Sequence, residues 1–92
     1  MNRKQALLGQ LAEECCELAK NALKGQRFGH DDDFMEISPE LMMKDEYADI
    51  MVVIAMLYEE GIDLRPDTKV MGEKRAKRET FIEYSKKKGQ IQ

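Results

Sequence analysis

The chain has no tryptophan, one histidine, two prolines and two cysteines among its 92 residues. Cys15 and Cys16 are adjacent in a segment predicted to be helical, where neighbouring side chains diverge by about 100° and cannot form an ordinary disulfide. The longest unbroken apolar run, residues 50–58, is far shorter than the roughly 20 residues of a membrane-spanning helix. These absences exclude a disulfide framework, a zinc cluster and a membrane span, and we expect a cytoplasmic protein.

What the chain does contain is 42% apolar and 36% charged residues, a composition typical of helical globular proteins. A chain of this length forms one domain, residues 1–92, and buries only about 60–65% of its unfolded surface when it folds alone. We therefore expect an all-α helical bundle with a thin core.

The first predicted helix covers residues 2–24, and a glycine, Gly25, is expected to end it. Apolar residues recur along it in steps of three and four, which marks one face of an amphipathic helix. That stripe is Leu8, Leu11, Cys15, Leu18 and Ala22. Residues 25–34 have two glycines, three acids and no period, so they are predicted to form a loop, with a short helix near Phe34 as an alternative.

Two more helices are predicted from the residues that begin and end them. Ser38 and Pro39 match an N-cap with proline at the first helical position, and that helix should run to residue 60 and stop at Gly61. Pro66 can start a third helix, which should continue to about residue 88, where Gly89 closes it.

The second helix is apolar around its whole circumference over residues 50–58, so it must be buried on all sides. Three helices can hardly surround it. We therefore predict that a second copy of the chain covers the remaining face, most simply in a two-fold homodimer, with a homotetramer left open. The alternative is that the short helix near Phe34 provides the cover within one chain.

Charge is unevenly distributed along the chain. Residues 1–66 carry 7 Lys and Arg against 14 Asp and Glu, a net charge of −7, whereas residues 67–92 carry 8 against 4, a net charge of +4. An acidic site facing a basic element suits an anion bound together with a cation, such as a metal-bound phosphate. The alternative is that the charges are segregated only for solubility.

Two pairs of acids stand three residues apart on neighbouring predicted helices: Glu14 with Glu17, and Glu46 with Asp49. At that spacing two side chains share a helix face, with Cβ atoms about 5–6 Å apart. Winding at 100° per residue turns Glu14 and Glu17 inward and Glu13 outward. Glu46 and Asp49 lead into the apolar run.

Four converging carboxylates repel one another unless a counter-ion is present. All four ligands would be oxygens, and the single histidine, His30, lies in the predicted loop. Hard oxygen ligands favour Mg²⁺, with Mn²⁺ as a substitute. The sequence therefore predicts a magnesium site built from Glu14, Glu17, Glu46 and Asp49.

Several short motifs together resemble the MazG-like, all-α nucleoside triphosphate pyrophosphohydrolases, in particular their short, phage-type members. They are L-A-E-E-C-C-E-L-A at residues 11–19, R-F-G at 27–29, E-Y-A-D-I-M at 46–51 and E-Y-S at 83–85. The resemblance implies Mg²⁺-dependent cleavage of an NTP or dNTP between its α- and β-phosphates, giving the monophosphate and pyrophosphate. By position it makes Glu14, Glu17, Glu46 and Asp49 the metal ligands and catalytic residues. The same scaffold also serves phosphoribosyl-ATP pyrophosphohydrolases, which is the alternative within the enzyme class.

The third predicted helix carries Lys74 and Lys77 in one stripe with Val70, Phe81 and Tyr84. One interpretation is that Lys74, Lys77 and the neighbouring Arg78 bind the triphosphate. The other is that the lysine stems cover the core edge while their ammonium groups reach water. The resemblance favours phosphate binding, although K-R-A-K-R at residues 74–78 departs from the K-x-x-R-R form of the family.

A rival of another class is a non-catalytic helical module, with residues 50–58 as a dimer seam and the basic third helix docking on nucleic acid or a protein partner. Such a module has no reason to place Glu46 and Asp49 at the entrance to its core. We therefore expect nucleotide rather than nucleic acid as the ligand.

Overall fold

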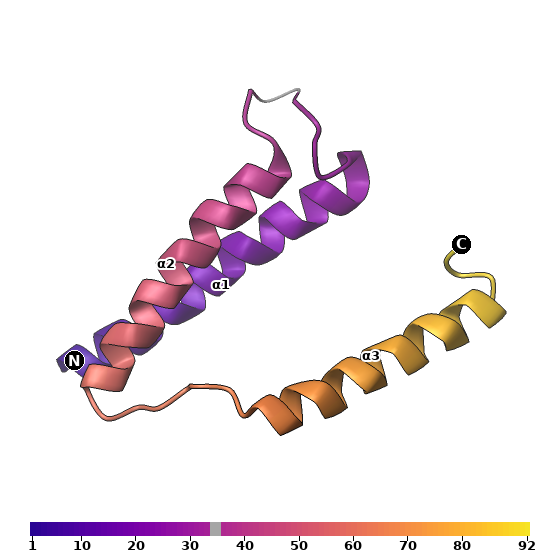
Figure 1. Cartoon of the computed structure of the whole chain (residues 1–92). Coiled ribbons are helices and arrows are strands. Elements are labelled where there is room, and N and C mark those ends of the chain that lie inside the picture. Colours follow the sequence, from indigo (N-terminus) through magenta and orange to yellow (C-terminus); the bar gives the residue numbers. More distant parts are fainter. Residues whose placement is uncertain (34–35) are drawn as a thin grey trace.

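The computed structural model describes residues 1–33 and 36–92, and over these residues the fold contains three helices and no strand. They are α1 (Arg3–Phe28), α2 (Pro39–Glu59) and α3 (Thr68–Lys87). The all-α prediction is confirmed (Figure 1). The short helix near Phe34, which was the alternative prediction, falls on a position outside the described residues. None of the helices in the described part of the chain is both long and apolar enough to cross a membrane.

Helix α1 begins at a capping box in which the Asn2 side chain accepts a hydrogen bond from the Gln5 N–H, and the Gln5 side chain accepts one from the Asn2 N–H, both at 2.8 Å. The predicted end at Gly25 is wrong. The helix continues to Phe28 and ends at Gly29, whose φ of 101° favours glycine. Gly25 instead lies where α1 approaches α2, since a Cβ added to it would stand 3.5 Å from the Cβ of Pro39.

The predicted start and end of α2 are confirmed. Ser38 Oγ accepts a hydrogen bond from the Leu41 N–H at 3.2 Å, Pro39 occupies the first turn, and Gly61 adopts a φ of 90° just beyond the helix. The start of α3 differs by two residues from its prediction. Asp67 caps it by accepting from two backbone N–H groups, so Pro66 belongs to the connector and not to the helix.

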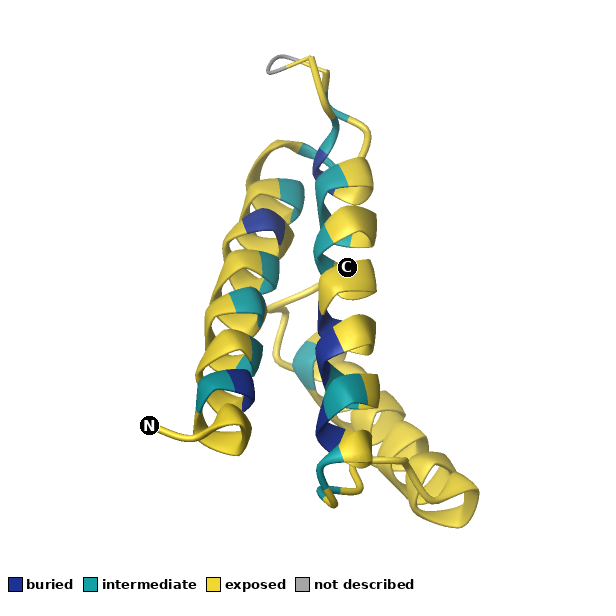
Figure 2. Cartoon of the chain, turned by 90° about the vertical axis from the view of Figure 1, so that its left-hand side faces the viewer, coloured by how far each residue is buried: buried dark blue, intermediate teal, exposed yellow. Residues whose placement is uncertain are grey.

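Helices α1 and α2 form an antiparallel hairpin (Figures 1 and 2). Its core is the cluster of Leu7, Val53 and Leu57, with Leu57 fully buried. At the end distant from the loop, Arg3 Nε and Glu60 Oε1 are paired at 2.6 Å. At the loop end, the Glu40 N–H donates to the His30 carbonyl at 2.9 Å. The hairpin is thus closed at both ends.

The face of α1 that packs against α2 is rotated by less than one residue from the predicted stripe, since Leu11 and Leu18 belong to both. Leu8 is 45% exposed, and Cys15 and Ala22 are also exposed. Apart from the half-buried Ala6, the buried and half-buried positions keep the same steps of three and four, and are Leu7, Leu11, Glu14, Leu18, Asn21 and Gly25. The sequence prediction ranked positions by apolarity alone, whereas the packed face of α1 includes two polar residues.

Helix α2 is not buried on all sides within one chain. Ile50, Val53 and Leu57 are buried against α1, whereas Met51 is 48% and Val52 58% exposed. Only one helix packs on α2, so half of its apolar circumference stays open to solvent. Cover by a second copy therefore stays a prediction.

Helix α3 packs against neither α1 nor α2 and contains no buried residue. Figure 2 shows α3 exposed along almost its whole length, and Figure 1 shows it apart from the hairpin. Its boundaries depend on local caps, because no tertiary contact fixes them.

Candidate metal centre

Two of the predicted site residues lie in the seam between α1 and α2. Glu14 occupies a half-buried position between Leu11 and Leu18 on the packed face of α1. Glu46 is half-buried on α2, one turn before the buried Ile50. Both carboxylates are held there by the same spacing that buries the apolar residues around them.

Asp49 joins these two at the exposed edge of the seam. One carboxylate oxygen from each of Glu14, Glu46 and Asp49 lies within 4.8 Å of the others. Oxygen atoms that share one Mg²⁺ or Ca²⁺ ion, at about 2.0–2.6 Å each, stand at most about 4–5 Å apart. The three-carboxylate set therefore has the dimensions of a site for one hard divalent cation.

The electrostatics of this set indicate negative charge without compensation. The pKa of Glu14 is raised from 4.5 to about 7, first because protonated Glu14 can hydrogen-bond to the Glu46 side chain, then because of burial and the charges of Asp49, Glu46 and Glu17. Glu46 Oε2 is shielded from solvent and receives no hydrogen bond from an N–H or hydroxyl group in the described part of the chain. A divalent cation would compensate both the shared charge and the unpaired oxygen, so the residues present fit such an ion.

Glu17 lies outside the three-carboxylate set. Its Oε1 pairs with the Lys20 ammonium at 3.2 Å, and its side chain is half exposed. Glu14 lies within the packed face of α1, whereas Glu17 is exposed at the rim of that face. Glu17 still acts on the set through its charge, and its role as a ligand stays a prediction.

The basic residues predicted to bind phosphate are far from the acidic set within one chain. Lys74, Lys77 and Arg78 are all exposed on α3, which does not contact the hairpin. The Lys77 ammonium lies over the Phe81 ring, 5.8 Å from its centroid, within its own helix. A single chain therefore separates the two halves of the predicted site.

No family model, curated protein or solved structure matches this chain. The resemblance to MazG-like enzymes therefore stays a prediction from the motif residues.

Asn21 is a polar residue that the sequence prediction missed. It is only 7% exposed and lies seven residues after Glu14 on the packed face of α1. Counting polar as well as apolar residues at steps of three and four from Leu7 would have found it.

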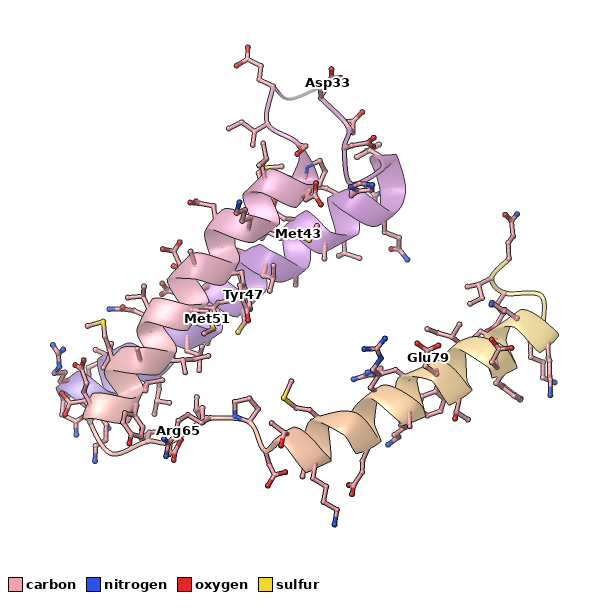
Figure 3. All side chains as sticks on the ribbon, in the orientation of Figure 1. Asp33, Met43, Tyr47, Met51, Arg65 and Glu79 are labelled. Atoms are coloured by element: carbon pink, nitrogen blue, oxygen red, sulfur yellow. The ribbon has the colours of Figure 1, made fainter. Side chains whose placement is uncertain are left out.

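Beside the seam between α1 and α2, the hairpin has a groove of about 650 Å³, lined by Leu18, Glu40, Leu41, Met43, Lys44 and Tyr47. In Figure 3, Met43, Tyr47 and Met51 follow one another along α2, on its side nearer to α3 in that view.

Proposed function

We propose that this protein is a Mg²⁺-dependent nucleoside triphosphate pyrophosphohydrolase of the MazG-like type, with Mn²⁺ as a possible substitute ion. It would cleave an NTP or dNTP between the α- and β-phosphates, giving the nucleoside monophosphate and pyrophosphate. The observation that carries the proposal is the convergence of Glu14, Glu46 and Asp49, from two helices, on one point of the seam.

The position of the acids is the main support. Placing carboxylates in a helix–helix seam costs free energy unless they are neutralised, and apolar residues there would stabilise the hairpin more. Acids on exposed helix faces carry no such cost. Glu14 and Glu46 are therefore easiest to understand as ligands kept for a cation despite their cost.

We propose a role for each of these residues. Glu14, Glu46 and Asp49 would hold the cation. When bound, a divalent cation neutralises phosphate oxygens and orients a water molecule for in-line attack on phosphorus. Of the two glutamates that can accept the proton of this water, we favour Glu17, because it borders the set without being part of it. Lys74, Lys77 and Arg78 would bind the triphosphate.

Pyrophosphate release from dNTPs in Mg²⁺ tests the proposal. We expect Glu46→Gln to lower the rate at least about 100-fold, since even indirect disturbance of a metal site costs 10–100-fold. The matched control is Glu59→Gln, which makes the same change at an exposed position of α2 outside the set and should leave the rate nearly unchanged. Absence of release with every nucleotide, or an unchanged rate in Glu46→Gln, would overturn the proposal.

Competition with phosphoribosyl-ATP would distinguish hydrolysis of that substrate from general NTP hydrolysis. A non-catalytic module that docks on nucleic acid is the second candidate, and the exposed, basic α3 favours it. That candidate predicts salt-sensitive DNA binding and no effect of Mg²⁺ on the melting temperature, whereas a cation site predicts a higher melting temperature in Mg²⁺.

A further inference from the structure

The chain exposes more surface than a compact protein of its mass. Its accessible area is 7836 Å² at 10.7 kDa, against about 5,500 Å² for a typical folded monomer of that mass. Its radius of gyration is 16.6 Å, against about 12 Å for a compact domain of 92 residues. The excess of roughly 2,300 Å² comes from the separation of α3 from the hairpin, visible in Figure 1.

The connector between α2 and α3 is ordered by local contacts. Asp63 accepts two hydrogen bonds from the Arg65 guanidinium, at 2.9 and 2.8 Å, and one from the Arg65 N–H at 3.0 Å. The same guanidinium lies over the ring of Tyr58, 4.6 Å from its centroid, which ties the connector to the end of α2. Pro66 then restricts the backbone on both of its sides. The connector is therefore ordered as far as Arg65, and α3 continues from it without touching the hairpin.

Each of the two parts leaves an amphipathic face open to solvent. Helix α3 presents one stripe that combines lysines with apolar and aromatic side chains, and it is Val70, Lys74, Lys77, Phe81 and Tyr84. The hairpin presents its groove, whose lining is largely apolar and includes Tyr47, 57% exposed. An amphipathic helix that lays its apolar stripe into an apolar groove is a common mode of association.

Their charges are complementary as well. Residues 1–66, which include the hairpin, carry 7 − 14 = −7, and residues 67–92, which include α3, carry 8 − 4 = +4. Two copies aligned so that like parts meet would repel, whereas contact between unlike parts is attractive.

We infer that α3 is an exchanged arm: the α3 helix of each chain packs into the hairpin groove of a second copy, in a reciprocal two-fold dimer. Burying the excess surface of both chains gives an interface of up to about 4,600 Å², within the range of obligate homodimers, about 2,000–5,000 Å². If the proposed function is correct, the exchange also brings Lys74, Lys77 and Arg78 of one copy to the hairpin that carries the acidic set of the other.

Sedimentation of the full-length protein tests the exchange without any nucleotide. At 0.1 M salt we expect twice the mass of one chain. The double variant Lys74→Glu/Lys77→Glu reverses two charges within the stripe and should raise the dimer dissociation constant at least about tenfold. The control Arg75→Glu/Lys86→Glu changes the net charge equally, but at positions about 140–160° from the centre of the stripe. It should stay dimeric.

Helix content, measured by circular dichroism, checks that both variants remain folded. A monomeric wild-type protein would overturn the exchange, and so would a dimer that the two double variants weaken equally. Phe81→Ala is a second test of the interface, and it does not alter charge. It should weaken the dimer, whereas Ile82→Ala, about 120° from the stripe centre, should not.

Mixing two inactive variants tests the composite site. Glu46→Gln lacks a hairpin ligand and Lys77→Ala lacks an arm cation, so an exchanged mixed dimer contains one site with both. Pyrophosphate release should reappear on mixing. No recovery between variants that do form mixed dimers would mean that the arm does not complete the site. A wild-type dimer without pyrophosphate release would instead reject the proposed function and leave the exchanged arm standing.

Discussion

Helices α2 and α3 have similar lengths but lie in very different surroundings. Helix α2, with 21 residues, buries Ile50, Val53 and Leu57 against α1, whereas α3, with 20 residues, buries none. Both begin at a side-chain cap and end before a glycine with positive φ. Capping residues are thus sufficient to define where a helix begins and ends, but only packing fixes its position in the fold.

The same difference applies to charge. A carboxylate in the seam of the hairpin changes its chemistry, as the raised pKa of Glu14 shows. The charged groups of α3 stand in water, where the surrounding dielectric weakens their interactions. The acidic residues are therefore brought together by packing within one chain. The basic residues of α3 would be brought into a packed environment only by a partner.

The largest contrast should come from truncating apolar side chains. Leu57→Ala removes a fully buried side chain and should lower the free energy of unfolding by about 2–5 kcal/mol. Ile82→Ala on α3, 39% exposed, should cost less than about 1 kcal/mol. Urea unfolding measures both. Equal losses would show that α3 belongs to the same cooperative unit as the hairpin.

A smaller contrast is expected in the pH dependence of the metal-free protein. The pKa of Glu14 is raised to about 7 in the folded chain from 4.5, so the proton is bound more tightly in the folded state. Its stabilising contribution is complete below pH 4.5 and is lost as the pH rises through about 7. The melting temperature should fall over that window.

Glu14→Gln should flatten this fall, whereas the control Glu79→Gln on α3 should retain it. Mg²⁺ at neutral pH should raise the melting temperature of the wild type and not of Glu14→Gln. An identical pH profile in all three proteins would contradict a charge conflict in the seam.

The smallest contrast concerns two helical glycines with open space around them, Gly9 in α1 and Gly72 in α3. Replacing either with alanine should favour its helix by about 0.5–1 kcal/mol. Gly9→Ala should raise the hairpin's melting temperature. Gly72→Ala should increase the helix content measured by circular dichroism without changing the hairpin's melting temperature in dilute protein. If Gly72→Ala raised that melting temperature as much as Gly9→Ala, the two parts of the chain would be coupled.

Much of the local structure was predictable. The cap at Ser38 and the stop at Gly61 bound α2 as expected, because these residues act on their own backbone. The end of α1 was not predictable in this way. Gly25 carries a helix-ending residue type but serves close packing against Pro39, a contact between residues that are distant along the chain.

The acidic site shows the same division. Three-residue spacing placed Glu14 and Glu46 each on a helix face with a second acid, which the sequence was able to predict. The inward position of Glu14 was also predicted, whereas the separation of Glu17 from the set and the burial of Asn21 followed only from the way α1 packs against α2.

By itself, the amino-acid sequence determined that this chain is helical, where most of its helices begin and end, and which acids share a helix face. These properties depend on residues within one or two turns of each other. The tertiary structure alone decided which three carboxylates meet and that α3 stands apart. Those outcomes depend on how two helix faces fit together, and the interhelical fit depends on every side chain in the seam at once.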